Sequence, residues 1–226
     1  DRLYMAISVG NATKLKFDDY FVQEGLAFRF TPFNYKKWGD AEGDNGYAID
    51  TEKFYENVMN RYKYGGLDTP GLYLDETTMR ICYSHRRLFA QLAKELVKQG
   101  DNARAQKVLA YAEQAIPAYN VPQVYESGSY EIATAYASIG ESGKAITLLN
   151  DLIAESRDYI DWAFSLGDSR IAMVQRDCLY KFWQWNQCNE LLKDMDKERY
   201  KQSNQQFEEK LSLIHISEPT RLDVIS

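Results

Sequence analysis

The sequence predicts a mainly α-helical protein that begins with a small mixed α/β segment. Three observations lead to this fold class. Short β-prone runs and glycine-rich loops occupy the first third of the chain, an apolar helical period dominates from Asp75 onward, and two helix–glycine–helix segments match each other at a fixed spacing. The 226 residues suffice for one good core or two small ones.

Residues 1–73 are expected to alternate short strands, helices and loops. The runs "LYMAISV" and "LAFRFTPF" are typical of strands, whereas "FDDYFVQEG" predicts a short helix that ends at Gly25. Asp50 is the expected N-cap of a helix over "TEKFYENVMNRY", whose apolar residues form one stripe. The chain starts without Met on a strand-like run, so we interpret it as a piece of a longer protein.

Residues 74–210 are predicted to form a helical domain. Glycine, proline and N-cap residues divide this part of the chain into separate apolar-periodic runs. The helices are expected at about 75–99, 103–116, 129–139, 144–155, 159–165, 171–186 and 188–210. Phe182 and Trp185 lie three residues apart on one helix face and are expected in the core, whereas Trp183 points elsewhere.

Two repeats are expected within this domain, at about 86–117 and 126–155, and the remaining helices would cap them. Each repeat reads as a helix, a glycine, a polar turn and a second helix entered through alanine. The matching pairs, all 40 residues apart, are Ala93/Ala133, Leu96/Tyr136, Gly100/Gly140, Ala105/Ala145 and Leu109/Leu149. Small residues at two of these positions would let the paired helices approach closely.

This pattern resembles the tetratricopeptide repeat, in which antiparallel helical hairpins stack into an α-solenoid. The departures are that Ser129 replaces Phe89, that Pro117 has no counterpart in the second copy, and that the period exceeds the usual length of about 34 residues. The alternative is an array of ordinary helical hairpins without that ancestry.

Composition excludes some classes of partner. The net charge is −6 and acidic and basic residues are interspersed, which argues against binding to nucleic acid or to an anionic membrane surface. No run approaches the 18 or so consecutive apolar residues of a transmembrane helix. The three cysteines, Cys82, Cys178 and Cys188, fit neither a disulfide framework nor a zinc site and are expected to be buried thiols.

No stretch of the sequence predicts an active site. The acidic loop at 40–46 lacks the glycine and the glutamate that a calcium loop requires, and a solvated turn is the simpler interpretation. His85 lacks a metal-ligating constellation and is expected at a surface or interface, while Asp18 and Asp19 are adjacent residues that complement a helix dipole. We therefore expect no catalytic residue, no cofactor and no bound metal.

A partner-binding groove is predicted on the concave face of the repeats, where such folds commonly bind peptides. A solvated basic face is the alternative interpretation of its cationic residues. The predicted groove residues are Arg87, Lys94, Lys98, Tyr130, Thr134 and Trp183.

Five stretches together resemble one family. They are "YMAISVGN", "DDYFVQEGLAFRFTPF", "IDTEKFYENVMNRYKYGG", "GLYLDETTMRICYSHRRLFAQLA" and "GSYEIATAYASIGESGKA". In this order they are similar to the C-terminal soluble region, of unknown function, of bacterial protein O-mannosyltransferase-like proteins, which are polytopic membrane glycosyltransferases of the GT-C type. The resemblance covers about residues 1–200.

The resemblance implies a missing N-terminal membrane domain that holds the catalytic site, a lipid-linked sugar donor and a protein acceptor. It also implies that this region lies on the extracytoplasmic, periplasmic face of the inner membrane. No catalytic residue of the family maps onto the chain, so we expect residues 1–210 to dock the acceptor or to support the membrane domain. A structural or assembly module is the alternative, and an exposed apolar area along residues 1–35 would favour it. A free-standing soluble enzyme is a third class, which the missing catalytic constellation disfavours.

Residues 211–226 are expected to be foreign to the protein. The alternation from Leu211 to Ser217 is like that of a short strand. However, "LSLIHISEPTR" matches the translation of a transposase-type sequencing adapter codon by codon, and the final Ile225 and Ser226 continue that match. We therefore interpret 211–226 as an adapter-derived tail and expect it to be poorly packed.

Overall fold

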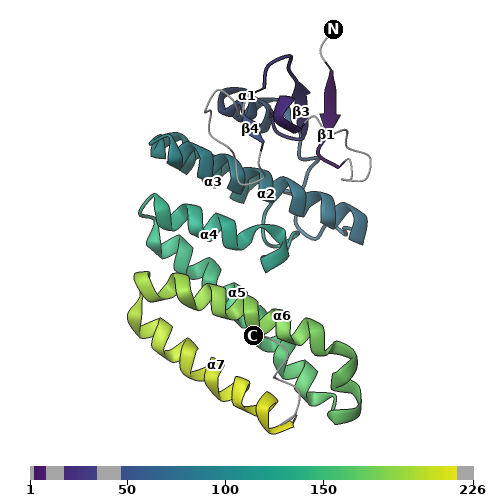
Figure 1. Ribbon diagram of the computed structural model, residues 1–226, viewed down its shortest axis with the longest axis vertical. Helices are drawn as coiled ribbons and strands as arrows, with labels where there is room; N and C mark the ends of the chain where they lie inside the picture. The colour runs from purple at the N-terminus through teal and green to yellow at the C-terminus, as the bar shows by residue number, and fades with distance from the viewer. Residues whose placement is uncertain (1–2, 9–17, 35–46, 218–226) are drawn as a thin grey trace. The chain divides into compact units, whose positions relative to one another are not determined.

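The computed structural model describes residues 3–8, 18–34 and 47–217. The chain divides into two compact units, Asp1–Pro122 and Gln123–Ser226, and the division falls in the connection between the two predicted repeats. Helices dominate both units and a small sheet lies near the N-terminus, so the mainly α fold class is confirmed (Figure 1).

The N-terminal unit opens with a four-stranded sheet in the order β1-β3-β2-β4. The strands are β1 (Tyr4–Ala6), β2 (Phe21–Gln23), β3 (Ala27–Phe30) and β4 (Ala48–Ile49). Strands β1 and β2 both pair antiparallel with β3, whereas β4 pairs parallel with β2. Two of these strands, β1 and β3, lie where the alternating runs predicted strands.

The helix predicted over "FDDYFVQEG" is wrong. A single 3₁₀ turn, η2 (Asp18–Tyr20), leads directly into β2, whose three residues are all buried as a central strand requires. Gly25 does not end a helix. It turns the chain from β2 into β3 with φ +110°, a left-handed conformation that favours glycine, and an added Cβ there would lie 2.5 Å from the Tyr62 hydroxyl. Tertiary pairing has therefore overridden the local helical pattern.

Asp50 begins the next helix as predicted. Its Oδ1 accepts a hydrogen bond from the Lys53 backbone N–H at 3.1 Å, and α1 (Thr51–Glu56) continues as a π-helical turn, η4 (Asn57–Arg61). Phe54 and Val58 are fully buried, as the apolar stripe predicted.

A helical hairpin completes the N-terminal unit. Helix α2 (Glu76–Lys98) packs against α3 (Asn102–Ala115), and Asp75 and Asp101 cap their N-termini through backbone N–H groups three residues on. The hairpin core consists of fully or nearly fully buried side chains: Phe89, Leu92, Ala93, Leu96, Ala105, Val108 and Leu109.

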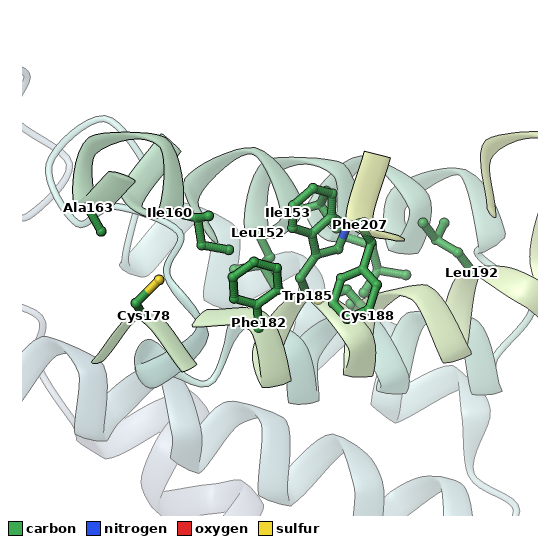
Figure 2. Packing of buried hydrophobic residues seen from close by; sticks show 12 residues of the cluster. Leu152, Ile153, Ile160, Ala163, Cys178, Phe182, Trp185, Cys188, Leu192 and Phe207 are labelled. Atoms are coloured by element: carbon green, nitrogen blue, oxygen red, sulfur yellow. The ribbon is translucent and has the colours of Figure 1, made fainter. Parts of the chain in front are cut away.

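The C-terminal unit is a succession of antiparallel helices. Its elements are η5 (Tyr125–Ser127), α4 (Ser129–Ser138), α5 (Ser142–Ser165), α6 (Asp168–Met195) and α7 (Lys197–Ser217). Each helix from α5 onward packs on the one before it, and Figure 1 shows α5, α6 and α7 side by side. The buried core lies between these helices around Phe182, Trp185 and Phe207, as expected for Phe182 and Trp185 (Figure 2).

Two predicted helix boundaries in this unit are wrong. The runs at 144–155 and 159–165 form one helix, α5, because no glycine or proline interrupts the chain between them. The break expected near residue 187 lies instead at Asp196, whose Oδ1 accepts a hydrogen bond from the Arg199 backbone N–H at 3.1 Å. This aspartate ends α6 because its side chain is the N-cap of α7.

The α2–α3 and α4–α5 hairpins have the same turn geometry. Gly100 and Gly140 adopt φ +77° and +84°, and the following N–H in each case donates to a carbonyl five residues earlier at 2.9 Å. All four repeat alanines are fully buried: Ala93, Ala133, Ala105 and Ala145. Small residues therefore occupy the same buried positions in both hairpins.

The backbone of α7 remains helical to Ser217, so the strand-like alternation after Leu211 is not realised. Phe207 is buried and Leu211, one turn later, is half-buried against the same core. Leu213 is 46% exposed, and the rest of the tail, 218–226, lies outside the described residues.

Candidate functional site

Four aromatic side chains of the C-terminal unit contact one another and form what we call the aromatic cluster: Tyr125 from η5, Tyr130 from α4, and Tyr180 and Trp183 from α6. The rings of Tyr125 and Tyr130 stack with centroids 5.1 Å apart, and those of Tyr180 and Trp183 stack at 5.4 Å. Tyr125 joins the two pairs because its ring meets Trp183 edge-on at 5.4 Å.

Helix α6 presents part of this cluster to solvent. Tyr180 and Trp183 lie three residues apart on one face and are each 46% exposed, whereas Trp185 is fully buried on the opposite face. Leu179 and Met173 on the same helix are also exposed. An exposed group of large apolar side chains is typical of a surface that binds a partner.

A carboxylate lies beside the rings because Glu126 follows Tyr125 directly in η5. Its Oε1 accepts hydrogen bonds from Gln184 Nε2 at 2.6 Å and from Lys181 Nζ at 3.5 Å. Partial burial opposes ionisation of Glu126, but the Gln184 hydrogen bond and the charge of Lys181 outweigh it, so the Glu126 pKa is lowered. Lys181 also donates to Glu155 Oε2 at 2.9 Å. The carboxylate is therefore ionised at neutral pH and held in place beside the cluster.

The structure brings together two of the predicted groove residues, Tyr130 and Trp183, since Tyr125 contacts both. Thr134 lies one turn after Tyr130 on α4, and its hydroxyl donates to the Tyr130 carbonyl at 3.0 Å. Trp183 is the exposed tryptophan of its helix, as its position next to Trp185 predicted.

The predicted cationic groove residues lie on α2 of the N-terminal unit. Arg87 and Lys94 are exposed, and Arg87 donates to Ser84 Oγ at 3.2 Å. Lys98 is also exposed and pairs with Glu95 at 2.7 Å. These three side chains share one face of α2, whereas the aromatic cluster belongs to the C-terminal unit.

Sequence reasoning missed Tyr125, Glu126 and Tyr180. The spacing of Tyr180 and Trp183 on a helix could have identified the stacked pair. The contact of Tyr125 with Trp183 could not have been identified, because it depends on how a residue of the short element η5 packs against a residue 58 positions later in the chain.

His85 is half-buried between tyrosine rings, where a surface or interface position was expected. Its imidazole meets Tyr64 edge-on at a centroid distance of 5.4 Å and Tyr62 at 6.1 Å. Its buried Nδ1 has no hydrogen-bond partner among the described residues. Burial lowers the pKa of His85, so the imidazole is neutral at neutral pH.

A polar network ties the sheet of the N-terminal unit to α1. Glu24 is almost fully buried and pairs with Arg29 and with Lys53 Nζ, the latter at 3.0 Å. The hydrogen bond from Lys53 to Glu24 raises the Lys53 pKa. A cavity of about 300 Å³ lies beside this network, and its other charged residues, Glu56 and Arg61, pair with each other at 2.5 Å. Because these charges already satisfy one another, we interpret the network as structural.

Other chemistry is limited in the part of the chain that the structure describes. It contains no group of three or more His, Cys, Asp or Glu side chains that could hold a metal ion. All three cysteines are buried thiols, as expected, and burial raises the pKa of Cys178 to about 11 and that of Cys188 to about 12. None of the described helices is long and apolar enough to cross a membrane.

Comparisons with known proteins return no relatives. No family model matches the chain, and neither a curated protein nor a solved structure is detectably similar to it.

Proposed function

We propose that residues 1–210 are the extracytoplasmic, periplasmic domain of a membrane-embedded glycosyltransferase similar to the protein O-mannosyltransferases. In this proposal the missing membrane domain transfers the sugar, and the present region docks the acceptor protein. The observation that supports docking most strongly is the exposed aromatic cluster on α4, η5 and α6.

Tyrosine and tryptophan are the residues that contribute most to binding energy at protein interfaces, together with arginine. They bury a large area while losing little side-chain entropy, and Trp183 and Tyr180 already hold each other in place by stacking. The cluster therefore has the composition and the rigidity of a peptide-binding surface.

We further propose that both hairpins are degenerate tetratricopeptide repeats. Their shared turn geometry and buried alanines support this ancestry. The concave face of each repeat would then be a binding surface, and Arg87, Lys94 and Lys98 would lie on that of the first hairpin.

Sugar transfer by the membrane-embedded parent protein tests the docking role. We expect Trp183→Ala to raise the KM for the protein acceptor and to leave kcat and the KM for the sugar donor unchanged. Trp162→Ala is the matched control, because Trp162 on α5 is 48% exposed and lies outside the cluster. Full transfer to the acceptor by a parent protein that lacks this whole region would contradict the docking role.

A structural or assembly role is the second candidate, and one observation favours it. The N-terminal unit exposes large apolar side chains along residues 3–33: Leu3 at 64%, Phe33 at 59%, Tyr4 at 45% and Phe30 at 37%. This surface would contact the parent's own membrane domain or another subunit. Loss of transfer after Leu3→Ser and Phe33→Ser, with the KM for the acceptor unchanged, would favour this role over docking.

A further inference from the structure

We propose that the aromatic cluster binds a basic segment of its partner, with an arginine or lysine cation lying on the exposed rings of Tyr180 and Trp183 and pairing with Glu126. This inference rests on the proposed docking function and names the chemistry of the docked segment. Three features of the C-terminal unit lead to it: its overall charge, the charge beside the cluster, and the exposure of the rings.

Formal charge is divided unequally between the two units. Residues 1–122 contain 16 acidic and 16 basic side chains, whereas residues 123–210 contain 15 acidic and 10 basic, a net charge of −5. The unit that carries the cluster therefore carries the negative charge of the protein. Complementary charge accelerates association and rejects partners of the wrong sign, so this unit favours a basic partner.

The charge next to the cluster has the same sign. Lys181 lies between Glu126 and Glu155, so one ammonium group compensates two carboxylates. Glu131 follows Tyr130 directly, and its charge acts on the hydroxyls of both Tyr125 and Tyr130. Carboxylates thus lie beside the rings on both sides of the Tyr125–Tyr130 pair, in a unit whose net charge is negative.

The stacked pair leaves part of each ring accessible to such a cation. The rings of Tyr180 and Trp183 are nearly parallel, with an interplanar angle of 11°, and each side chain is 46% exposed. A cation is attracted to an aromatic face when it lies within about 6 Å of the ring centroid, and tryptophan is the best acceptor. The planar guanidinium group of arginine can stack on this surface more closely than an ammonium group.

Glu126 supplies the matching anion. Its side chain is 44% exposed, so a partner can reach it, yet the fully buried Gln184 holds it by a hydrogen bond of 2.6 Å. A carboxylate held in this way can form a charge-assisted hydrogen bond with arginine without first losing its own conformational freedom. A neutral saccharide could stack on the rings but would gain nothing from the negative charge.

Fluorescence anisotropy with the 226-residue chain tests this inference. The probe is a nonapeptide of glycine and serine with two arginines, labelled with an uncharged dye. A second probe replaces both arginines by citrulline, which keeps the shape and the amide-like donors but has no charge. We expect saturable binding of the arginine peptide that weakens as salt is raised, and binding of the citrulline peptide weaker by about tenfold.

Two variants locate the site. Trp183→Ala should weaken binding of the arginine peptide by about tenfold and Glu126→Gln by about threefold. Trp162→Ala and Glu208→Gln, which change an exposed tryptophan and an exposed glutamate elsewhere in the same unit, should leave the affinity within about twofold of wild type. Equal losses in the control variants would overturn the assignment of the site.

The outcomes separate this inference from the docking function on which it rests. Equal binding of both peptides, lost in Trp183→Ala, would overturn the basic-segment inference and leave peptide docking intact. Binding of a neutral hexose oligosaccharide in place of both peptides, again lost in Trp183→Ala, would overturn both and identify a saccharide site.

Discussion

The α2–α3 and α4–α5 hairpins share the same turn geometry, but residues at equivalent positions differ in burial and in hydrogen-bond partners. Counting 40 residues along the chain, Arg86 corresponds to Glu126 and the buried Ala90 to the half-buried Tyr130. Arg86 is buried and donates to the carbonyls of Val121 and Pro122 at 2.7 and 2.8 Å. These hydrogen bonds hold the loop that follows the first hairpin against α2. The same repeat position in the second hairpin holds a half-exposed carboxylate bound to α6.

The aromatic residues show the same contrast. In the first hairpin, Phe89 is fully buried and its ring lies 5.5 Å from that of Tyr64 and 5.9 Å from that of Tyr111. Ser129 lies at the equivalent position of the second hairpin, where it is buried and forms hydrogen bonds with Ser127 and Gln123. The second hairpin thus directs its rings outward to meet Trp183. The two hairpins therefore share a turn and four buried alanines. In the first, the equivalent aromatic residue is buried, whereas the second contributes to an exposed aromatic cluster.

The largest expected effect is the loss of Arg86. Its guanidinium donates hydrogen bonds to the carbonyls of Ile116, Val121 and Pro122, and burial lowers its pKa to about 10. Arg86→Met should lower the free energy of unfolding by about 3 kcal/mol, because it leaves buried carbonyls unpaired. Glu126→Gln should cost less than about 1 kcal/mol, since its side chain is half-exposed. Urea denaturation followed by circular dichroism measures both changes in the free energy of unfolding. Equal losses would contradict the different roles of the two equivalent residues.

Replacing a repeat alanine by a larger residue should lower the free energy of unfolding by a similar amount in either hairpin. Ala93→Leu and Ala133→Leu each insert a larger side chain between packed helices at a fully buried position. Each should destabilise the protein by about 1–3 kcal/mol. A cost in one hairpin without a cost in the other, in the same denaturation experiment, would mean that their helix packing is not equivalent.

Alanine at either turn glycine should lower the free energy of unfolding by the same amount, and by less than leucine at a repeat alanine. Gly100→Ala and Gly140→Ala each place a Cβ in open space but at positive φ, so only the backbone conformation is penalised, by about 1 kcal/mol. Gly143→Ala provides the control, since Gly143 lies within α5 and alanine there should stabilise the helix by about 0.5 kcal/mol. Unequal costs at 100 and 140 would show that the two turns are not the same motif.

The pH dependence of stability should distinguish the hairpins further, because His85 corresponds to Tyr125 in the second copy. The His85 pKa is lower in the folded state, so the unfolded chain binds the proton more readily. The stability contributed by the neutral imidazole is present above the unfolded pKa of about 6.5 and is lost as the pH falls through the lower folded pKa. We expect His85→Gln to flatten the stability profile between pH 7 and 5, and an unchanged profile would contradict the buried position of His85.

Removal of residues 213–226 should have the smallest effect. Leu213 is 46% exposed, whereas Phe207 is buried in the core and Leu211 is half-buried against it. A chain ending at Ser212 should unfold within about 0.5 kcal/mol of the full chain, whereas Phe207→Ala should cost about 3 kcal/mol. A large loss on truncation would contradict the interpretation of the tail as foreign sequence.

Local chemistry explains which parts of the fold could be predicted from the sequence. The hairpins were predictable because Asp75, Asp101, Gly100 and Gly140 begin and end their helices by contacts within a few residues. Strand β2 was not, because the run at 18–25 has a helical pattern and only pairing with β3 makes it extended. The exposure of Trp183 followed from its helix face, but its partner Tyr125 comes from η5, whose position against α6 no local pattern specifies.

The indole N–H signals of the C-terminal unit test the central claim most directly, because a basic peptide should reach Trp183 in the cluster but neither Trp162 nor Trp185. The buried Trp185 donates its Nε1–H to Ser203 Oγ at 2.8 Å, and Trp162 is as exposed as Trp183 but lies elsewhere on the unit. Titration of the ¹⁵N-labelled chain with the arginine peptide, with signals assigned by single Trp→Phe variants, should shift the Trp183 indole signal progressively and leave those of Trp162 and Trp185 in place. An unmoved Trp183 signal, or equal movement of the Trp162 signal, would contradict the account.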